Sequence, residues 1–132
     1  MNWKEKENLL TTALNVKEVL ETAIKAVDSK KANHIVALDM RQVSLMADYF
    51  VIADAASNRQ VQAIVTEVKD KVLAAGGQVK LIEGFQKADW VLIDLGDVIV
   101  HIFSTEQRDF YNLERLWHDA PYLDLTRLLV TD

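Results

Sequence analysis

The sequence predicts an α/β fold: one compact domain in which helices flank a mixed five-stranded sheet. Short apolar runs alternate with segments of helical periodicity, a pattern typical of α/β domains. The helical segment between the second and third runs is long enough for a parallel crossover. The fourth and fifth runs are so close in sequence that they must be antiparallel. A length of 132 residues suits a single domain with a substantial core.

The first predicted helix follows Asn15, which is placed to cap its N-terminus. Its apolar residues recur at helical spacing and are Val16, Val19, Leu20, Ala23, Ile24 and Val27. Lys30 and Lys31 lie near its end, where positive charge complements the helix dipole. The polar residues 1–14 are expected to form an N-terminal extension of the domain.

Two short strands are predicted next, at residues 34–39 and 49–54, joined by residues 40–48. Ser57 is the candidate N-cap of the second helix. The apolar stripe of this helix consists of Val61, Ile64, Val65, Val68, Val72 and Leu73. Gly76-Gly77 ends the helix, because glycine accepts the left-handed backbone common at helix C-termini. A third strand is expected at residues 78–83, followed by a turn.

Residues 90–95 and 98–103 predict a β-hairpin, because the Gly96-Asp97 pair between them is typical of a type II′ turn. A two-residue turn fixes the register and places Asp94 opposite Ile99 and Trp90 opposite Phe103. One face of the hairpin is then wholly aliphatic and belongs to a core. The other, mixed face carries Trp90, Leu92, Asp94, Ile99, His101 and Phe103. This face either is partly open or supplies Asp94 with a buried partner.

The last predicted helix begins after Thr105 as N-cap and ends before Pro121. Its apolar residues are Phe110, Leu113, Leu116 and Trp117. The domain therefore spans residues 15–120, and residues 121–132 are expected to form a C-terminal tail.

Composition excludes several classes of function. The formal net charge of −5 argues against a direct DNA or RNA binder, which needs a basic patch. The same charge suits a basic protein partner, although mild acidity also serves plain solubility. Cysteine is absent, so disulfides and thiolate chemistry are excluded. No apolar run is long enough for a membrane span or a signal peptide, and we expect a cytoplasmic protein.

Catalytic chemistry has little support in the sequence. A nucleotidyltransferase needs two metal-binding carboxylates one residue apart on a strand, whereas Asp94 and Asp97 are separated by a turn. Ser57 has no nucleophile-elbow context and is better explained as an N-cap. The three histidines lack metal-ligand spacing. We therefore expect no enzyme activity, no metal and no cofactor.

Several charged or polar side chains still need partners. Arg59 and Arg108 lie in predicted first turns, where the helix dipole disfavours cations. Asp48 or Asp54 is the expected partner of Arg59, and Asp97 or Asp109 that of Arg108, although contact with another protein is equally open. For His101, we expect a partner in Asp94 or Glu83.

A set of residues with a distinctive order and spacing runs through most of the chain: Asp39, Ser44, Ala47-Asp48-Tyr49-Phe50-Val51-Ile52, Ser57-Asn58-Arg59-Gln60-Val61, Glu83-Gly84, Trp90, Asp94-Leu95-Gly96-Asp97-Val98-Ile99-Val100-His101-Ile102-Phe103, Arg108, Tyr111, Leu113-Glu114 and Leu116-Trp117. In this set the chain resembles the Iojap family, the ribosomal silencing factors. The resemblance covers roughly residues 16–121. It implies a fold related to nucleotidyltransferases but without their activity.

The resemblance also implies a function. A silencing factor binds the large ribosomal subunit through ribosomal protein L-fourteen and sterically blocks joining of the small subunit, which represses translation. A large-subunit assembly factor is the main alternative, and a nucleotidyltransferase-like enzyme is a weaker one. A homodimer of the free protein is a further possibility.

The candidate partner-binding surface combines the hairpin with the last helix. Its residues are Trp90, Asp94, Leu95, Asp97, Val98, His101, Arg108, Tyr111, Glu114 and Trp117. Tryptophan is enriched at interface hot spots but is also a common core anchor. The position of Trp90 on the mixed face favours an interface. The helical stripe favours a core position for Trp117.

Overall fold

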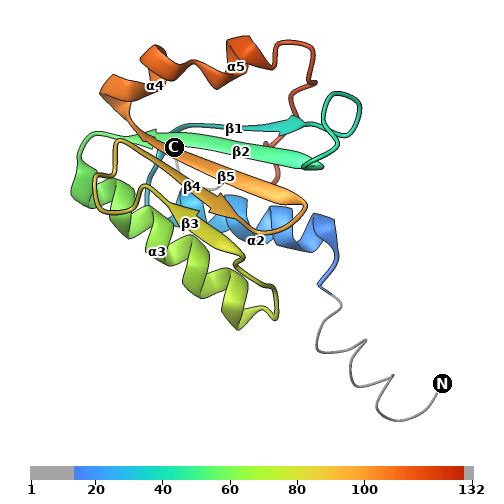
Figure 1. Ribbon diagram of the computed structural model, residues 1–132. Helices are drawn as coiled ribbons and strands as arrows, with labels where there is room; N and C mark the ends of the chain where they lie inside the picture. Colours follow the sequence, from blue (N-terminus) through green and yellow to red (C-terminus); the bar gives the residue numbers. More distant parts are fainter. Residues whose placement is uncertain (1–13, 130–132) are drawn as a thin grey trace, which may run out of the picture.

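A five-stranded mixed sheet separates two helical layers of unequal size (Figure 1). The computed structural model describes residues 14–129. Its elements are α2 (Val16–Ser29), β1 (Asn33–Asp39), β2 (Tyr49–Ala55), α3 (Asn58–Ala74), β3 (Leu81–Glu83), β4 (Trp90–Asp94), β5 (Val98–Ser104), α4 (Thr105–Tyr111) and α5 (Leu113–Leu116). The predicted mixed five-stranded α/β fold is confirmed, and its relation to nucleotidyltransferases stays a prediction.

The strand order is β1-β2-β5-β4-β3. Strands β2 and β5 pair in parallel at the centre, and all other neighbours are antiparallel. β3 therefore runs in the direction of β2, as the predicted crossover requires, but β5 and β4 lie between these two strands. β3 is also shorter than predicted and occupies an edge of the sheet.

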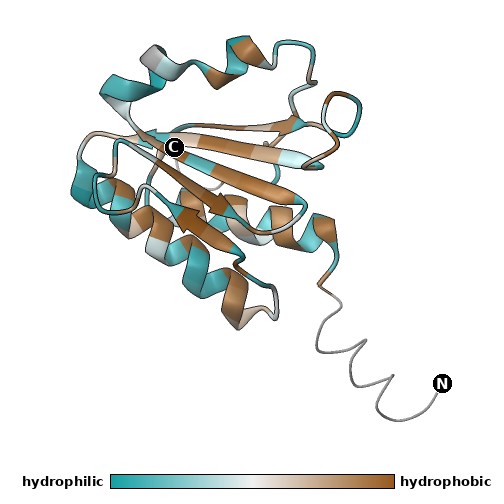
Figure 2. Cartoon of the chain, viewed as in Figure 1, coloured by the Kyte–Doolittle hydropathy of each residue, from teal (hydrophilic) through white to brown (hydrophobic). Residues whose placement is uncertain are grey.

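The larger core lies between the sheet and helices α2 and α3 (Figure 1). Both predicted N-caps are confirmed: the Asn15 side chain accepts from the Glu18 amide at 2.9 Å, and Ser57 Oγ accepts from the Gln60 amide at 3.1 Å. Hydrophobic residues are concentrated on the strands and on the sides of the two helices that face them (Figure 2). Leu73 was expected in this core but is 50% exposed.

The hairpin register agrees with the prediction at every position, from Trp90 opposite Phe103 to Asp94 opposite Ile99. Gly96 has a φ of +101°, which glycine accepts readily. Asp97 has no positive φ, which excludes a type I′ turn. All six residues of the aliphatic face are buried against α2 and α3: Val91, Ile93, Leu95, Val98, Val100 and Ile102.

The last helix was predicted to be continuous, and this prediction is wrong. Asn112 adopts a left-handed conformation with a φ of 42° and divides the segment into α4 and α5. Asparagine tolerates this region better than most residues, and its side chain accepts from the Arg115 amide at 3.2 Å. Because the helix direction changes there, Leu116 is 67% exposed instead of buried. The Phe110 side chain lies outside the described part of the structure.

Helix α4 begins at Thr105, one residue earlier than predicted. Ser104 occupies the N-cap position, and Thr105 lies within the helix. A smaller core forms beneath α4 and α5, with Phe50, Phe103 and Leu113 among its buried residues. The two faces of the sheet thus support cores of different size.

Residues 121–129, assigned to a tail by the sequence, pack on the domain instead. Leu125 is buried in the larger core, and Leu123, Leu128 and Leu129 pack against it. The expected extension at residues 1–14 lies almost wholly outside the described residues. Between residues 14 and 129, no helix combines the length and apolar character needed to cross a membrane.

Candidate functional site

An aromatic cluster occupies the mixed face of the hairpin where β4 begins. The Trp90 ring lies 5.2 Å from the Phe103 ring and 4.6 Å from the Tyr111 ring of α4, measured between centroids. Phe103 is buried, Trp90 is half-buried, and Tyr111 is 40% exposed. The backbone of Gly84 lies close to the start of β4, since a Cβ on this residue would lie 2.4 Å from the Trp90 carbonyl oxygen. The cluster is thus packed on its inner side and open to solvent at its outer edge.

His101 anchors the inner side of this cluster. Its Nδ1 accepts a hydrogen bond of 3.1 Å from the Trp90 indole N–H, and its ring packs edge-on against Phe50. The expected partners Asp94 and Glu83 are wrong: Asp94 accepts instead from the Gly96 amide at 2.8 Å. Burial lowers the pKa of His101 to about 4, so the ring is neutral at physiological pH. Its Nε2 is buried without a hydrogen-bond partner among the described residues.

A buried carboxylate, Asp54, ties helix α4 to the sheet. Arg108 Nη1 donates to Asp54 Oδ2 at 2.8 Å and to the His34 carbonyl at 2.6 Å. Thr105 Oγ1 donates to Asp54 Oδ1 at 2.7 Å, and His34 Nδ1 lies 2.9 Å from Oδ2. Both oxygens of the buried acid thus have partners, as a charge in this environment requires. We call Asp54, His34, Thr105 and Arg108 the Asp54 cluster.

The Asp54 cluster corrects both expected arginine pairs. Arg108 is buried and pairs with Asp54, not with Asp97 or Asp109. It also lies 3.2 Å from Glu114 Oε1, an ion pair outside hydrogen-bond geometry. Asp54 is therefore not the partner of Arg59, which is exposed and has no ion pair among the residues described. The cluster holds α4 in place and thereby fixes Tyr111 over Trp90.

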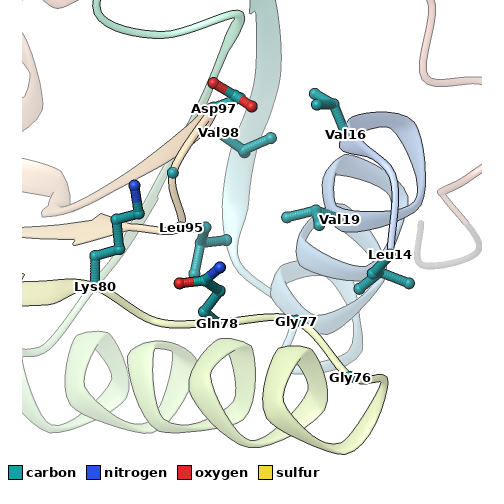
Figure 3. Close-up of a pocket in the computed structure, with 11 residues that line it drawn as sticks. Leu14, Val16, Val19, Gly76, Gly77, Gln78, Lys80, Leu95, Asp97 and Val98 are labelled. Atoms are coloured by element: carbon teal, nitrogen blue, oxygen red, sulfur yellow. The ribbon is translucent and has the colours of Figure 1, made fainter. Parts of the chain in front are cut away.

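The hairpin turn lies at the other end of β4 and lines a cavity of about 360 Å³. Figure 3 shows Leu95 and Val98 beside Val19 and Leu14 in this cavity, with Asp97 and Lys80 also in its lining. Leu95 and Val98 are buried, whereas Asp97 is exposed. The backbone carbonyl of Asp97 accepts from the amides of Asp48 and Tyr49 at 2.7 and 3.1 Å. The carbonyl of this turn residue is thus used within the fold, whereas its side chain is exposed.

Neither region has the composition of a metal centre. Among residues 14–129, no group of three or more histidine, cysteine, aspartate or glutamate side chains is placed to hold a metal ion. In the Asp54 cluster the negative charge is matched by Arg108, and the donors that surround the carboxylate occupy the positions a cation would need.

The family model described as RsfS, ribosomal silencing factor during starvation, matches residues 13–132. This chain belongs to the RsfS family. The predicted resemblance is therefore confirmed. The ribosomal silencing factor RsfS of Bacillus subtilis is 54% identical over 112 residues, which cover 85% of this chain and 95% of that protein.

More distant relatives of this chain have names that refer to chloroplasts and mitochondria. The chloroplastic protein Iojap of Zea mays is 37% identical over 102 residues, covering 76% of this chain and 44% of that protein. The mouse protein named mitochondrial assembly of ribosomal large subunit protein 1 is 26% identical over 101 residues, covering 74% of this chain and 44% of that protein.

A crystal structure from Bacillus halodurans shares the fold with a TM-score of 0.74 at 48% identity, covering 83% of this chain and 99% of that one.

In this RsfS-family chain the ten predicted surface residues do not form one patch. Trp90, His101, Arg108, Tyr111 and Glu114 gather around the aromatic cluster and the Asp54 cluster. Leu95, Asp97 and Val98 lie at the turn, about 17 Å away along β4 at the usual rise of a strand. Asp94 lies between the two groups on the mixed face. Trp117 is half-buried after α5, with its ring 6.1 Å from Phe50.

Sequence reasoning missed several exposed apolar residues of this RsfS-family chain. Leu45 and Met46, in the loop between β1 and β2, are 106% and 84% exposed. Two neighbouring large apolar residues in a segment without periodicity were the available signal. Leu92 and Ile99 were placed on the mixed face by the predicted register but were not included among the candidate surface residues; they are half-buried and lie between Trp90 and the turn. They extend the aromatic cluster toward Asp97.

Proposed function

We propose that this chain is a ribosomal silencing factor that docks on ribosomal protein L-fourteen of the large subunit and sterically blocks joining of the small subunit. Membership of the RsfS family supports this function. The observation that carries the docking site is the half-exposed Trp90, held by a buried neutral histidine and packed against an aromatic residue of α4. Rigid aromatic side chains with one open edge are typical anchors of protein interfaces.

The proposed docking strip runs along the mixed face of the hairpin. It consists of Trp90, Leu92, Asp94, Ile99 and Tyr111, with Asp97 at its end. The strip is apolar along its length and acidic toward the turn. Leu95, Val98, His101 and Arg108 are buried, so in the proposal they support this strip from beneath and do not touch the partner. Glu114 and Trp117 flank it on the side of α5.

Charge favours the same kind of partner. The chain has 20 acidic and 15 basic residues, a balance that attracts a basic ribosomal protein and repels bare RNA. A 15.0 kDa body is large enough to obstruct an intersubunit contact without any chemistry. The proposal places the protein in the cytoplasm, where the subunits join to translate.

An assembly role for the large subunit is the second candidate. The name of the mouse relative favours it, because that protein is named for assembly of the mitochondrial large subunit. Both functions share a binding event on the large subunit. They differ in whether the bound particle is mature or still a precursor.

A sedimentation experiment tests the docking strip. We expect the purified protein to co-sediment with mature large subunits and to lower the yield of joined ribosomes. Trp90→Ala should weaken binding by about 2 kcal/mol or more, because central aromatic anchors dominate interface energies. The matched control is Leu73→Ala, which removes another partly exposed apolar side chain, this time from α3 on the opposite layer, and should bind normally.

The two candidate functions give different outcomes in this assay. Binding to mature subunits with reduced joining supports silencing. Binding restricted to precursor particles, with joining of mature subunits unchanged at saturating protein, would reject silencing in favour of assembly. If Trp90→Ala binds as well as Leu73→Ala while both are folded, the docking strip is wrong even where the function stands.

A further inference from the structure

Leu45 and Met46 form an exposed apolar pair in the loop between β1 and β2. They are the two most exposed large apolar side chains that the structure describes. The loop, residues 40–48, projects beyond the end of β1 (Figure 1). Single exposed apolar residues are common, whereas two neighbours that neither core covers form a local apolar patch that a partner can bury.

Hydrogen bonds tie the β1–β2 loop together. The Met40 amide donates to the Asp48 carbonyl at 2.8 Å and closes the base of the loop. The Ser44 amide donates to the Met40 carbonyl at 2.9 Å, and Ser44 Oγ accepts from the Met46 amide at 3.1 Å. The Met40 side chain is buried in the smaller core. The pair is therefore already ordered, so its burial against a partner requires little further loss of conformational entropy in the loop.

The β1–β2 loop adjoins the turn end of the docking strip. The Asp48 amide donates to the Asp97 carbonyl at 2.7 Å, which joins the loop to the hairpin turn. Val43 of the loop packs against the smaller core, as do Ile99 and Trp90 of the docking strip. The loop and Trp90 thus belong to the same layer of the molecule and lie near opposite ends of β4.

The charges beside the pair suit a basic partner. Asp48 lies two residues after Met46, and Asp97 is exposed at the adjoining turn. Arg41, the only cation of the loop, donates from Nε and Nη2 to the Asp39 carboxylate at 2.9 and 2.7 Å, which balances its charge within the chain. The remaining charges of the loop and the turn are negative. They complement a basic protein and repel RNA and anionic lipid.

We infer that Leu45 and Met46 are a second anchor of the docking strip and enter an apolar pocket with a basic rim on the same large-subunit protein that Trp90 contacts. The inference rests on the proposed function and adds a contact at the other end of the strip. Leucine supplies a branched apolar group, and the flexible thioether of methionine adapts to an irregular pocket. Two anchors separated by the length of β4 fix the orientation of the bound protein, which a steric block requires.

Substitutions at the pair test the inference through binding kinetics. Leu45→Ala and Met46→Ala should each weaken binding of the full chain to mature large subunits about 10-fold, because each removes apolar surface that is buried in the complex. The loss should appear in the dissociation rate, with the association rate unchanged, because no charge is altered. Leu73→Ala on α3 is again the matched control and should bind normally. Urea unfolding of both loop variants should give the wild-type midpoint, since both side chains are exposed.

The absence of cysteine allows a second measurement in the full chain. Met46→Cys introduces a single thiol of small size, and the mass of the chain reports its alkylation by iodoacetamide. An excess of mature large subunits should slow this alkylation at least 10-fold, because the thiol is enclosed in the partner's pocket. Lys69→Cys, at an exposed position of α3, should react at the same rate with and without subunits.

The outcomes separate this inference from the function on which it rests. If the wild type does not bind large subunits, both are rejected. If the wild type binds, then loop variants that bind as tightly as Leu73→Ala, or a thiol at position 46 that stays reactive in the bound complex, overturn the second anchor alone. Protection of that thiol by anionic phospholipid vesicles instead of large subunits would assign the pair to a membrane surface and would also overturn it.

Discussion

His101 is an uncharged histidine inside an aromatic cluster, and its environment gives it a measurable signature. Burial lowers the pKa of His101 to about 4, well below its ordinary value of 6.5. Between these values the unfolded chain binds a proton that the folded chain does not. Protonation of His101 therefore disfavours the folded state, and the contribution of this residue to stability is complete only above the ordinary pKa.

We expect the free energy of unfolding to fall as the pH is lowered from about 6.5 toward 4, by up to about 1.4 kcal/mol per pH unit from this residue. Above that range His101 should add no pH dependence. Urea unfolding of wild type and His101→Gln across this range measures the difference, since all other titrating groups are shared. Parallel curves for the two proteins would contradict the assignment.

The partner of His101 could have been found in the sequence. The predicted register places Trp90 opposite Phe103, two residues from His101 on the same face, and diagonal neighbours on a sheet lie within reach of aromatic side chains. The sequence analysis instead favoured a carboxylate as the partner of the imidazole.

The partner of Arg108 could not have been found in this way. Its partner Asp54 lies on another strand, and only the long-range pairing of β2 with β5 brings α4 close to it.

At the scale of elements, the Asp54 cluster decides where α4 lies. Arg108 is buried against Asp54, whereas Arg59 in the first turn of α3 is exposed. The two arginines differ in burial, so substituting each in turn measures how much the buried ion pair contributes to the free energy of unfolding.

Arg108→Met should lower the free energy of unfolding by about 3–5 kcal/mol, because it leaves Asp54 as a buried charge without its cation. Arg59→Met should change it by less than about 0.5 kcal/mol, as is usual for exposed positions. Methionine retains much of the apolar stem in both variants, so the comparison isolates the charge. Urea unfolding at neutral pH provides both values. Equal losses would show that the buried ion pair contributes little.

Local patterns predicted some elements well and others poorly. The hairpin register followed from the two residues between the strands, because a two-residue loop leaves no freedom in pairing. The break at Asn112 was missed because Phe110, Leu113 and Trp117 keep helical spacing across it. Strand order was not predictable, since neither turn chemistry nor periodicity states which distant strands pair. The alternation had already placed Leu95 and Val98 on the core face, which argued against including them in a contact surface.

At the scale of the whole molecule, charge affects the rate at which the protein associates with a partner. Asp97 lies exposed at the end of the docking strip, and only its backbone is used in the fold. Its side chain can therefore be changed with little effect on stability.

Asp97→Lys should slow association with isolated large subunits at low salt, because it reverses a charge that faces the basic partner in our proposal. Raising the salt until the Debye length falls from ~10 Å to ~3 Å should slow the wild type toward the rate of this variant. Stopped-flow or biosensor association rates measure both effects. Asp70→Lys is the control, since it makes the same charge change at an exposed position of α3. If both variants slow equally, total charge and not the position of Asp97 governs the encounter.

Residues 121–123 cover the outer edge of β1, because Tyr122 lies opposite Leu38 in an antiparallel bridge. Of the five described strands β1 is synthesised first, whereas the segment that covers its edge is synthesised after all five. The central pairing of β2 with β5 likewise joins segments made far apart in time. A nascent chain therefore holds an unpaired strand edge until residues 121–123 emerge, and such edges are prone to aggregation in this period. Ending translation after Ala120 would prolong that exposure indefinitely, so the truncated chain should be insoluble.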